Sequence, residues 1–412
     1  MSGLAGVEAA ATALRDLTEP TPLQRNVFLS DRYGAEIWLK REDLSPVRSY
    51  KLRGAFNAMR KAVARGAGRF VCASAGNHAQ GMAYACRHFA AEGVVFMPVT
   101  TPQQKIDKTR QFGGGAVEIR MVGDYFDDTL AAAQAYCAEA GAVFLPPFDD
   151  ADVIEGQATC AAEILEQLPE GVAPDLLVLP VGGGGLSSGM VPVFAARAPG
   201  TSVRFVEPAG APSLARALAA GGPVTLPAVD NFVDGAAVAR IGALNYAVLA
   251  GRRADEVVIA PEDRICATIV EMLNVEGMVL EPAGALAIDA LRDLDVAGKV
   301  VVAVVSGGNF DFERLPEVKE RALRWAGRKK YFILRLPQRP GALREFLECL
   351  GPGDDITRFE YLKKSARNFG SVLLGIEAKA GSDFAGLCAR MDAAGFTYQD
   401  VTDDAVITDL VV

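Results

Sequence analysis

A run of four glycines is the strongest chemical signal in the sequence. It follows the apolar run Leu176–Val181 and precedes a helix-like segment. Glycine has no Cβ, so its backbone can close around an anion, and the start of a helix adds unpaired N–H groups and a favourable dipole. A flexible loop or a dinucleotide site are alternatives, although the spacing fits GxGxxG poorly. The pattern predicts a phosphate site formed by Gly182, Gly183, Gly184, Gly185 and Leu186.

Two further apolar runs end in small polar residues. One is followed by Ser74-Ala75-Gly76-Asn77-His78, the other by Ser306-Gly307-Gly308-Asn309. Amides at a helix start could hold a carboxylate, the Asn77 amide could donate to a ligand oxygen, and the Ser306 hydroxyl suits a heterocyclic nitrogen. Each motif alone is also compatible with an ordinary turn. Ligands of open α/β sheets bind beyond the carboxyl ends of the strands, so we expect the three loops to converge.

Lys51 opens a helix-like run within Ser49-Tyr50-Lys51-Leu52-Arg53. Most lysines are solvated surface charges, which is the simplest alternative for this one. A cation at a helix start opposes the helix dipole, and partial burial there would lower the pKa of the amine. A neutral amine is the form that Schiff-base chemistry requires, so Lys51 is a candidate covalent site.

These motifs require strands that present them and helices that follow. From about residue 50 to 325, short apolar runs alternate with helix-like stretches such as Asp124–Ala140 and Asp152–Leu168. Runs this short and apolar are typical of parallel strands buried on both faces. The alternation predicts an open α/β fold with helices on both sides of the sheet.

The pattern changes near Arg328. The remaining residues show the β-α-β-β-α-β order of a ferredoxin-like unit. Its expected elements are a strand at Tyr331–Leu336, a helix after Arg339-Pro340-Gly341, strands at Ile356–Lys363 and Ser371–Ala378, a helix near Phe384–Ala394 and a last short strand. The charged stretch Arg321–Lys330 is the expected linker. We therefore predict domains at 1–327 and 328–412, with a smaller subdomain at roughly 50–150.

Composition limits the function classes. Half of the 412 residues are hydrophobic, and 42 Lys+Arg against 51 Asp+Glu give a net charge of −9. This balance argues against nucleic-acid binding and against disorder. No long apolar stretch predicts a membrane span, and the first residues do not resemble a secretion signal. The seven cysteines are scattered and form no CxxC, and the chain has only two histidines, so a metal site is not expected. The same cysteine pattern favours a cytoplasmic location.

Taken together, SYKLRGA, SAGNHAQG, VGGGGL and SGGN resemble fold-type II pyridoxal-phosphate (PLP) enzymes of the tryptophan-synthase β-like group. Within that group the chain is similar to the threonine dehydratases (threonine ammonia-lyases). The C-terminal unit resembles their ACT-like regulatory domain, and one such unit is typical of the short biosynthetic form. The resemblance covers nearly the whole chain and implies two α/β subdomains plus the ACT-like domain.

The resemblance also implies roles for individual residues. Lys51 matches the lysine that forms a Schiff base with pyridoxal 5'-phosphate, and the glycine loop with Leu186 matches the phosphate site. Asn77 matches the residue that binds the cofactor's phenolic oxygen, and Ser306 the partner of the pyridine nitrogen. The loop around the substrate carboxylate is matched by Ser74, Ala75, Gly76, Asn77 and His78. Glu207 falls where some relatives place a cation ligand, but the acidic partner that those relatives carry is missing, so no metal is predicted.

The implied activity is α,β-elimination of L-threonine, the first step of isoleucine biosynthesis. A neutral serine at the ring nitrogen should leave it largely unprotonated, which favours prompt loss of the β-hydroxyl. Serine racemases place a serine where this chain has Ala75, and a methyl group cannot transfer a proton. L-serine dehydration and serine racemisation remain alternatives. A nucleotide-binding protein without covalent cofactor is a third class, which leaves Lys51, Asn77 and Ser306 unexplained.

The C-terminal unit is expected to bind an effector. Isoleucine, with valine as a second effector, is implied by the resemblance, at Leu343 in the helix start and at Phe359 and Tyr361 in a strand. A solely structural or oligomerising unit is the alternative. Control of this kind acts through a coupling free energy between two states of an assembly, so we expect a homo-oligomer, a tetramer or a dimer.

Overall fold

The computed structural model describes residues 3–362, 368–404 and 406. The chain divides into two compact units. The first unit comprises Met1–Glu262 and Val275–Asp311, and the second comprises Asp263–Asn274 and Phe312–Val412. After the roles expected from the sequence, we call the first the catalytic unit and the second the regulatory unit. Helix α11 (Glu262–Glu276) therefore groups mainly with the C-terminal residues. The predicted boundary between 327 and 328 stays a prediction.

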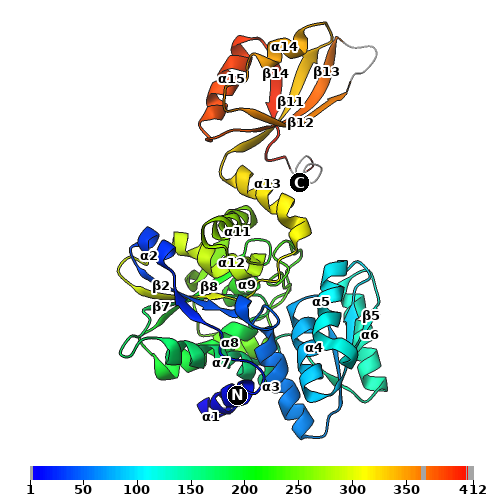
Figure 1. The fold of residues 1–412 in the computed structure, drawn as a ribbon, viewed down its shortest axis with the longest axis vertical. Helices are drawn as coiled ribbons and strands as arrows, with labels where there is room; N and C mark the ends of the chain where they lie inside the picture. Colours follow the sequence, from blue (N-terminus) through cyan, green and yellow to red (C-terminus); the bar gives the residue numbers. More distant parts are fainter. Residues whose placement is uncertain (1–2, 363–367, 405, 407–412) are drawn as a thin grey trace. The chain divides into compact units, whose positions relative to one another are not determined.

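The catalytic unit contains a six-stranded sheet in the order β1-β2-β10-β7-β8-β9. Every neighbouring pair is parallel except β1 with β2. The strands are β1 (Leu23–Arg25), β2 (Glu36–Arg41), β7 (Leu176–Pro180), β8 (Ser202–Pro208), β9 (Val257–Ala260) and β10 (Val300–Val305). The helices of the catalytic unit include α1 (Leu4–Leu14), α2 (Val27–Tyr33), α7 (Ala151–Gln167), α8 (Gly185–Arg197), α9 (Ser213–Ala220), α10 (Ala243–Leu249) and α12 (Pro282–Asp289), most of which are labelled in Figure 1.

A second, fully parallel sheet of the catalytic unit has the order β5-β4-β3-β6. Its strands are β3 (Arg69–Ala73), β4 (Glu92–Met97), β5 (Val117–Met121) and β6 (Val143–Phe144), and the helices of this region are α3 (Lys51–Ala64), α4 (Asn77–Phe89), α5 (Gln103–Gly113) and α6 (Phe126–Glu139). Buried apolar residues lie on both faces of β3: Phe70 and Cys72 join one core cluster, Val71 and Ala73 another. This arrangement confirms the predicted open α/β architecture with two subdomains.

The regulatory unit contains an antiparallel sheet in the order β12-β13-β11-β14. Its elements are β11 (Lys329–Pro337), α14 (Ala342–Leu347), β12 (Asp355–Leu362), β13 (Phe369–Glu377), α15 (Asp383–Ala393) and β14 (Thr397–Asp400). Phe332, Leu334 and Phe346 are completely buried in its core. The predicted ferredoxin-like unit is confirmed; Lys363, expected in its second strand, lies outside the described residues.

The linker predicted at Arg321–Lys330 is wrong. Helix α13 (Leu315–Trp325) covers its first half and β11 its last residues. Val318 and Ala322 repeat at helical spacing and are buried, so the charged residues form only the outer face of an amphipathic helix. Among the described residues, no helix is both long and apolar enough to cross a membrane.

Candidate active site

The glycine run lies between β7 and α8 and is packed too closely for any side chain. A Cβ on Gly183 would lie 2.3 Å from the ring of Phe148, and one on Gly182 would lie 2.9 Å from the backbone of Ala236. Gly184 has a φ of +89°, a conformation that costs glycine little and other residues more. The four glycines are thus required by space and by backbone geometry.

The carbonyl groups of this loop point into the protein. Gly183 O accepts from Asn245 Nδ2 at 2.8 Å, and Gly182 O accepts from the Ser213 hydroxyl at 3.2 Å. Asn245 Oδ1 in turn accepts from Ser188 at 2.7 Å. The first N–H groups of a helix have no partner within it, so the inward carbonyls leave the amides at the start of α8 for a ligand.

Lys51 is the first residue of α3 and is partly buried. Its Nζ donates to Pro147 O at 2.8 Å and lies 5.3 Å from the ring centre of Tyr50 and 5.8 Å from that of Phe148. Phe148 is the ring that covers Gly183, so one aromatic side chain borders both the amine and the glycine loop. Burial lowers the pKa of Lys51 to about 8, although the negative charge of Glu281 opposes this change. A substantial fraction of the amine is therefore neutral at physiological pH.

The loop after β3 separates into two parts. Ser74, Ala75, Gly76 and Asn77 are partly exposed, and Ser74 Oγ accepts from Gly76 N at 3.2 Å. His78 is buried, and its Nε2 lies 2.8 Å from Leu145 O. Because a carbonyl only accepts, Nε2 carries the proton and donates. Burial, with a contribution from the charge of Lys51, lowers the pKa of His78 to about 3, so this imidazole is neutral.

Ser306 follows β10 and is buried beside the start of α3. Its hydroxyl donates to Ala283 O at 3.1 Å, and its carbonyl accepts from Tyr50 N at 3.1 Å. Ser49 forms an isolated bridge with Gly307, which fastens the third loop to the residues before Lys51. The predicted cofactor residues therefore gather at the carboxyl ends of β7 and β10 and at the starts of α3, α4 and α8.

Sequence reasoning gave no role to two polar residues that contact Asn77. Glu281 Oε1 accepts from Asn77 Nδ2 at 2.7 Å, and Asn309 Nδ2 donates to Asn77 Oδ1 at 2.8 Å. Glu281 immediately precedes α12 and carries no spacing signal in the sequence. Asn309 is the last residue of the SGGN motif, and this motif was the sequence signal from which its role could have been inferred. Phe148 and Asn245 were missed as well, because their importance comes from packing against glycines.

The Glu207 side chain caps the start of α9. Its two oxygens accept from the backbone N–H groups of Leu214 and Ala215 at 2.7 and 2.9 Å, at the start of α9. Burial raises the pKa of Glu207 to about 7, although these hydrogen bonds oppose the rise. Within the described ranges, His, Cys, Asp and Glu residues form no group of three that could hold a metal ion.

The three residues expected to bind an effector lie on the surface of the regulatory unit. Leu343 in α14, Phe359 and Tyr361 in β12 are 41, 37 and 39% exposed. Phe359 and Tyr361 are two residues apart on one strand and so share a face. A Cβ on Gly370 would meet the Tyr361 ring, which therefore lies over that position of β13.

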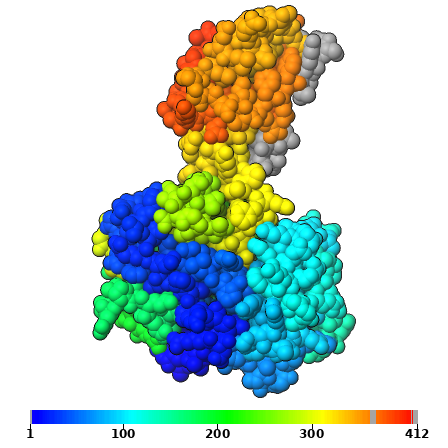
Figure 2. All heavy atoms as spheres, in the orientation of Figure 1, coloured from blue at the N-terminus to red at the C-terminus, as the bar shows by residue number. Residues whose placement is uncertain are grey.

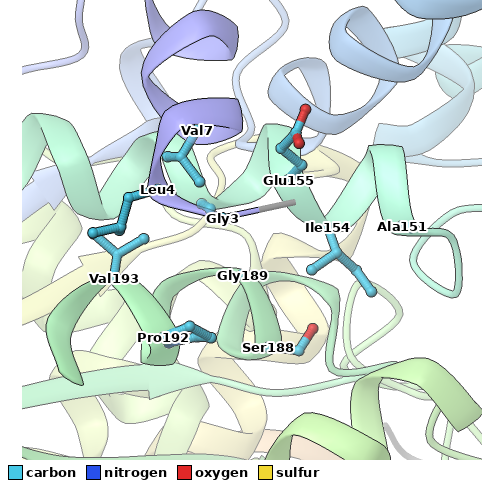
Figure 3. A pocket seen from close by; sticks show the side chains of 11 residues that line it. Gly3, Leu4, Val7, Ala151, Ile154, Glu155, Ser188, Gly189, Pro192 and Val193 are labelled. Atoms are coloured by element: carbon cyan, nitrogen blue, oxygen red, sulfur yellow. The ribbon is translucent and has the colours of Figure 1, made fainter. Parts of the chain in front are cut away.

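A separate pocket of about 250 Å³ lies between α1, α7 and α8 of the catalytic unit (Figure 3). Its lining is mainly apolar and includes Val7, Ile154 and Val193. None of the predicted site residues lines it, although Ser188 and Gly189 follow the glycine loop in α8. It is therefore distinct from the site around Lys51.

Comparison with known proteins defines the class first. Residues 14–307 match the family model described as "Pyridoxal-phosphate dependent enzyme", and residues 320–411 match "C-terminal regulatory domain of Threonine dehydratase". The biosynthetic L-threonine dehydratase of Bacillus subtilis is 46% identical over 97% of this chain and 95% of its own length. That of Halalkalibacterium halodurans is 42% identical over 98% and 97%. The chain therefore belongs to the PLP-dependent enzymes and, among them, to the family of biosynthetic threonine dehydratases.

Solved structures agree with this assignment. Processed threonine deaminase isoform 2 from Solanum lycopersicum has a TM-score of 0.71 and 37% identity, over 77% of this chain and 93% of that one. Maize serine racemase also reaches a TM-score of 0.71, at 25% identity over 79% and 98%. The fold is thus the fold-type II PLP architecture, shared by lyases and racemases.

The residues present fit the cofactor that the family implies, pyridoxal 5'-phosphate. The glycine loop and the start of α8 supply backbone donors for a phosphate, and the Ser187 hydroxyl at that helix start is buried and has no partner in the part of the chain that the structure describes. Lys51 supplies an amine of lowered pKa beside Phe148. Ser306 supplies a neutral hydroxyl at the next strand end.

Proposed function

We propose that the chain catalyses the α,β-elimination of L-threonine to 2-oxobutanoate and ammonia, as the first step of isoleucine biosynthesis. The observation that carries the proposal is the desolvated Lys51 amine beside the glycine loop. The relative from Bacillus subtilis, 46% identical over nearly the whole chain, is named a biosynthetic L-threonine dehydratase. When bound, the cofactor acidifies the Cα–H of an amino acid joined to it.

Lys51 has two tasks in this proposal. Its neutral amine would hold the cofactor covalently, and as a free amine Nζ would be the general base for the Cα proton of the substrate. The start of α3 and the Pro147 carbonyl position the Lys51 amine, which would favour proton transfer at a substrate bound beside it. We propose Ser74, Ala75, Gly76, Asn77 and the backbone at His78 as the substrate-carboxylate loop.

Ser306 and Asn77 complete the proposed cofactor site. The Ser306 hydroxyl donates to Ala283 O in the structure and has to turn its proton toward the pyridine nitrogen to serve as its partner. A hydroxyl is neutral and cannot keep that nitrogen protonated as a carboxylic acid would. With a hydroxyl as its partner, the bound cofactor would supply a weaker electron sink, which supports elimination.

Racemisation of serine is the alternative reaction on this fold, as in maize serine racemase. Ala75 argues against it, because a methyl group cannot return a proton to the second face of Cα. Steady-state formation of 2-oxoacids from L-threonine and L-serine, with assay of D-serine, tests both readings. D-serine formation as fast as ammonia release would refute the proposal, whereas 2-oxobutanoate as the main product would support it.

We further propose that isoleucine, with valine as a second effector, binds the regulatory unit at Leu343, Phe359 and Tyr361. The support is the match of residues 320–411 to a regulatory domain and the exposure of these apolar side chains. Removal of residues 330–412 should abolish isoleucine inhibition and spare the elimination. Unchanged inhibition after this truncation would contradict the proposal.

The proposed assembly is a homo-oligomer, a tetramer or a dimer, which provides two global states for the effector to bias. Its mass in solution, measured by light scattering with and without isoleucine, tests this. A cytoplasmic location is proposed on the ground that all seven cysteines are free thiols, six of them buried. Localisation of a tagged chain by fractionation tests that point.

A further inference from the structure

The side-chain amide of Asn77 is oriented by a chain of hydrogen bonds that begins at a backbone carbonyl. Asn309 Nδ2 donates both to Val47 O and to Asn77 Oδ1, each at 2.8 Å. Because Val47 O can only accept, the NH₂ group of Asn309 must face it, and both N–H bonds of that group are then used. It follows that Asn77 turns its oxygen toward Asn309 and its nitrogen away.

The nitrogen of Asn77 meets a carboxylate. Asn77 Nδ2 donates to Glu281 Oε1 at 2.7 Å, which uses one of its two N–H bonds. One N–H therefore remains for a ligand, and its direction is fixed by Asn309 on one side and Glu281 on the other. If the amide were flipped, two oxygens would face each other and the donor would point away from the site.

Glu281 is built into this position. It is buried, and a Cβ on Gly307 would lie only 2.1 Å from its Oε1, so the SGGN loop leaves room for the carboxylate by lacking a side chain there. The backbone N–H of Asn309 also donates to Glu281. The carboxylate thus joins the start of α12, the loop after β10 and the start of α4.

Charged and titratable groups face Glu281 from several elements. Burial, followed by the negative charge of Asp234, raises the pKa of Glu281 to about 7, while its hydrogen bond from Asn77 opposes the rise. The groups that interact with it electrostatically come from α3 and the residue before it, from α5 and from the loop before α10: Tyr50, Lys51, Lys105, Lys108 and Asp234.

We propose that Glu281 and Asn309 are positioning residues that aim the free N–H of Asn77 at the phenolic oxygen of the cofactor, and that the charge on Glu281 sets how readily this oxygen ionises. The inference rests on the proposed role of Asn77. An ionised Glu281 places a negative charge one side chain away from the phenolic oxygen and disfavours its ionised form. A protonated Glu281 removes that repulsion.

The test uses pyridoxal 5'-phosphate titrated into the cofactor-free full chain, with binding followed by absorbance and fluorescence. Glu281→Ala and Asn77→Ala should each weaken binding about tenfold, which corresponds to the lower end of the range for loss of one hydrogen bond to a charged group. The double variant should bind no worse than either single one, because both remove the same interaction. Losses that multiply in the double variant would overturn the proposal.

Glu281→Gln separates charge from position and keeps the shape of the side chain. Its amide oxygen still accepts from Asn77, so affinity should stay within about twofold of the parent. We expect the visible spectrum of the bound cofactor to change near pH 7 in the parent and to lose this change in Glu281→Gln. A spectrum that titrates as in the parent would refute the role of the charge, even if Glu281→Ala failed to fold.

Glu155→Gln is the matched control. Glu155 is a buried carboxylate in α7 that accepts from Asn57 and pairs with Lys61, remote from Asn77 in its contacts. Its spectrum should titrate as in the parent, and a changed spectrum would count against the proposal. If the parent chain converts L-threonine but the Asn77 and Glu281 losses multiply, this inference fails and the proposed function stands.

Discussion

The catalytic and regulatory units differ in what defines their proposed sites. In the catalytic unit the site is set by backbone: four glycines packed against Phe148, Ala236 and Asn245, and N–H groups at the start of α8. In the regulatory unit the proposed site consists of three exposed apolar side chains on α14 and β12. A backbone-defined site tolerates almost no substitution, whereas a side-chain surface can change one contact at a time.

The largest effect is expected from removal of the single amine. Lys51→Ala should lower turnover of L-threonine at least a thousandfold, because covalent attachment and proton transfer are both lost. The visible absorbance of the bound cofactor should disappear as well. Lys299→Ala, which removes a lysine paired with Asp295 on the surface, is the control and should keep activity. Full activity of Lys51→Ala would contradict the assignment of Lys51, and with it the location proposed for the active site in the catalytic unit.

The next effect concerns pH and stability. The folded-state pKa of Glu281 is raised from 4.5 to about 7, so the native chain holds a proton that the unfolded chain releases at lower pH. The protonated Glu281 therefore contributes to the free energy of unfolding. This contribution, up to about 3 kcal/mol, is complete below pH 4.5 and is lost as the pH rises through 7. The free energy of unfolding of the cofactor-free Glu281→Gln variant should therefore fall less between pH 5 and 8 than that of the parent, as measured by denaturant titration.

A comparison of two glycines tests whether the backbone defines the catalytic site. Gly183→Ala should weaken cofactor binding by about 2 kcal/mol, because its Cβ would overlap the Phe148 ring and overpacking has costs of that size. Gly200→Ala places a methyl group in open space and should bind the cofactor as the parent does. Equal affinity of the two variants, measured by titration, would remove the steric argument.

The smallest effect is expected in the regulatory unit. Phe359→Ala should weaken isoleucine inhibition by about 1 kcal/mol, or roughly fivefold in the inhibitory concentration, with turnover in the absence of effector unchanged. Tyr125→Ala removes another exposed aromatic residue, in the catalytic unit, and should leave inhibition unaltered. Inhibition curves at fixed L-threonine distinguish the two. A larger loss in Tyr125→Ala would mean that the effector surface lies elsewhere.

The sequence predicted the backbone-defined parts better than the rest. Glycine runs after apolar strands have few structural explanations, so the loop, the α/β sheets and the ferredoxin-like unit could all be anticipated. Glu281 could not, since a carboxylate at the start of a short helix is ordinary until Asn77 and Gly307 pack around it. The helix over Leu315–Trp325 was missed because its many charges obscured two buried positions. Contacts between distant residues decide such cases.

The position of β10 has a consequence for the order of synthesis. Among the described residues, β2 (36–41) pairs with β1 on one side and on the other with β10 (300–305), which in turn pairs with β7. A nascent chain emerging from the ribosome therefore carries β2 with an open edge until some 260 further residues have been translated. Open strand edges invite pairing with other chains. The main sheet cannot be completed until residues 300–305 have been translated, so its N-terminal strands are exposed to such pairing during that interval.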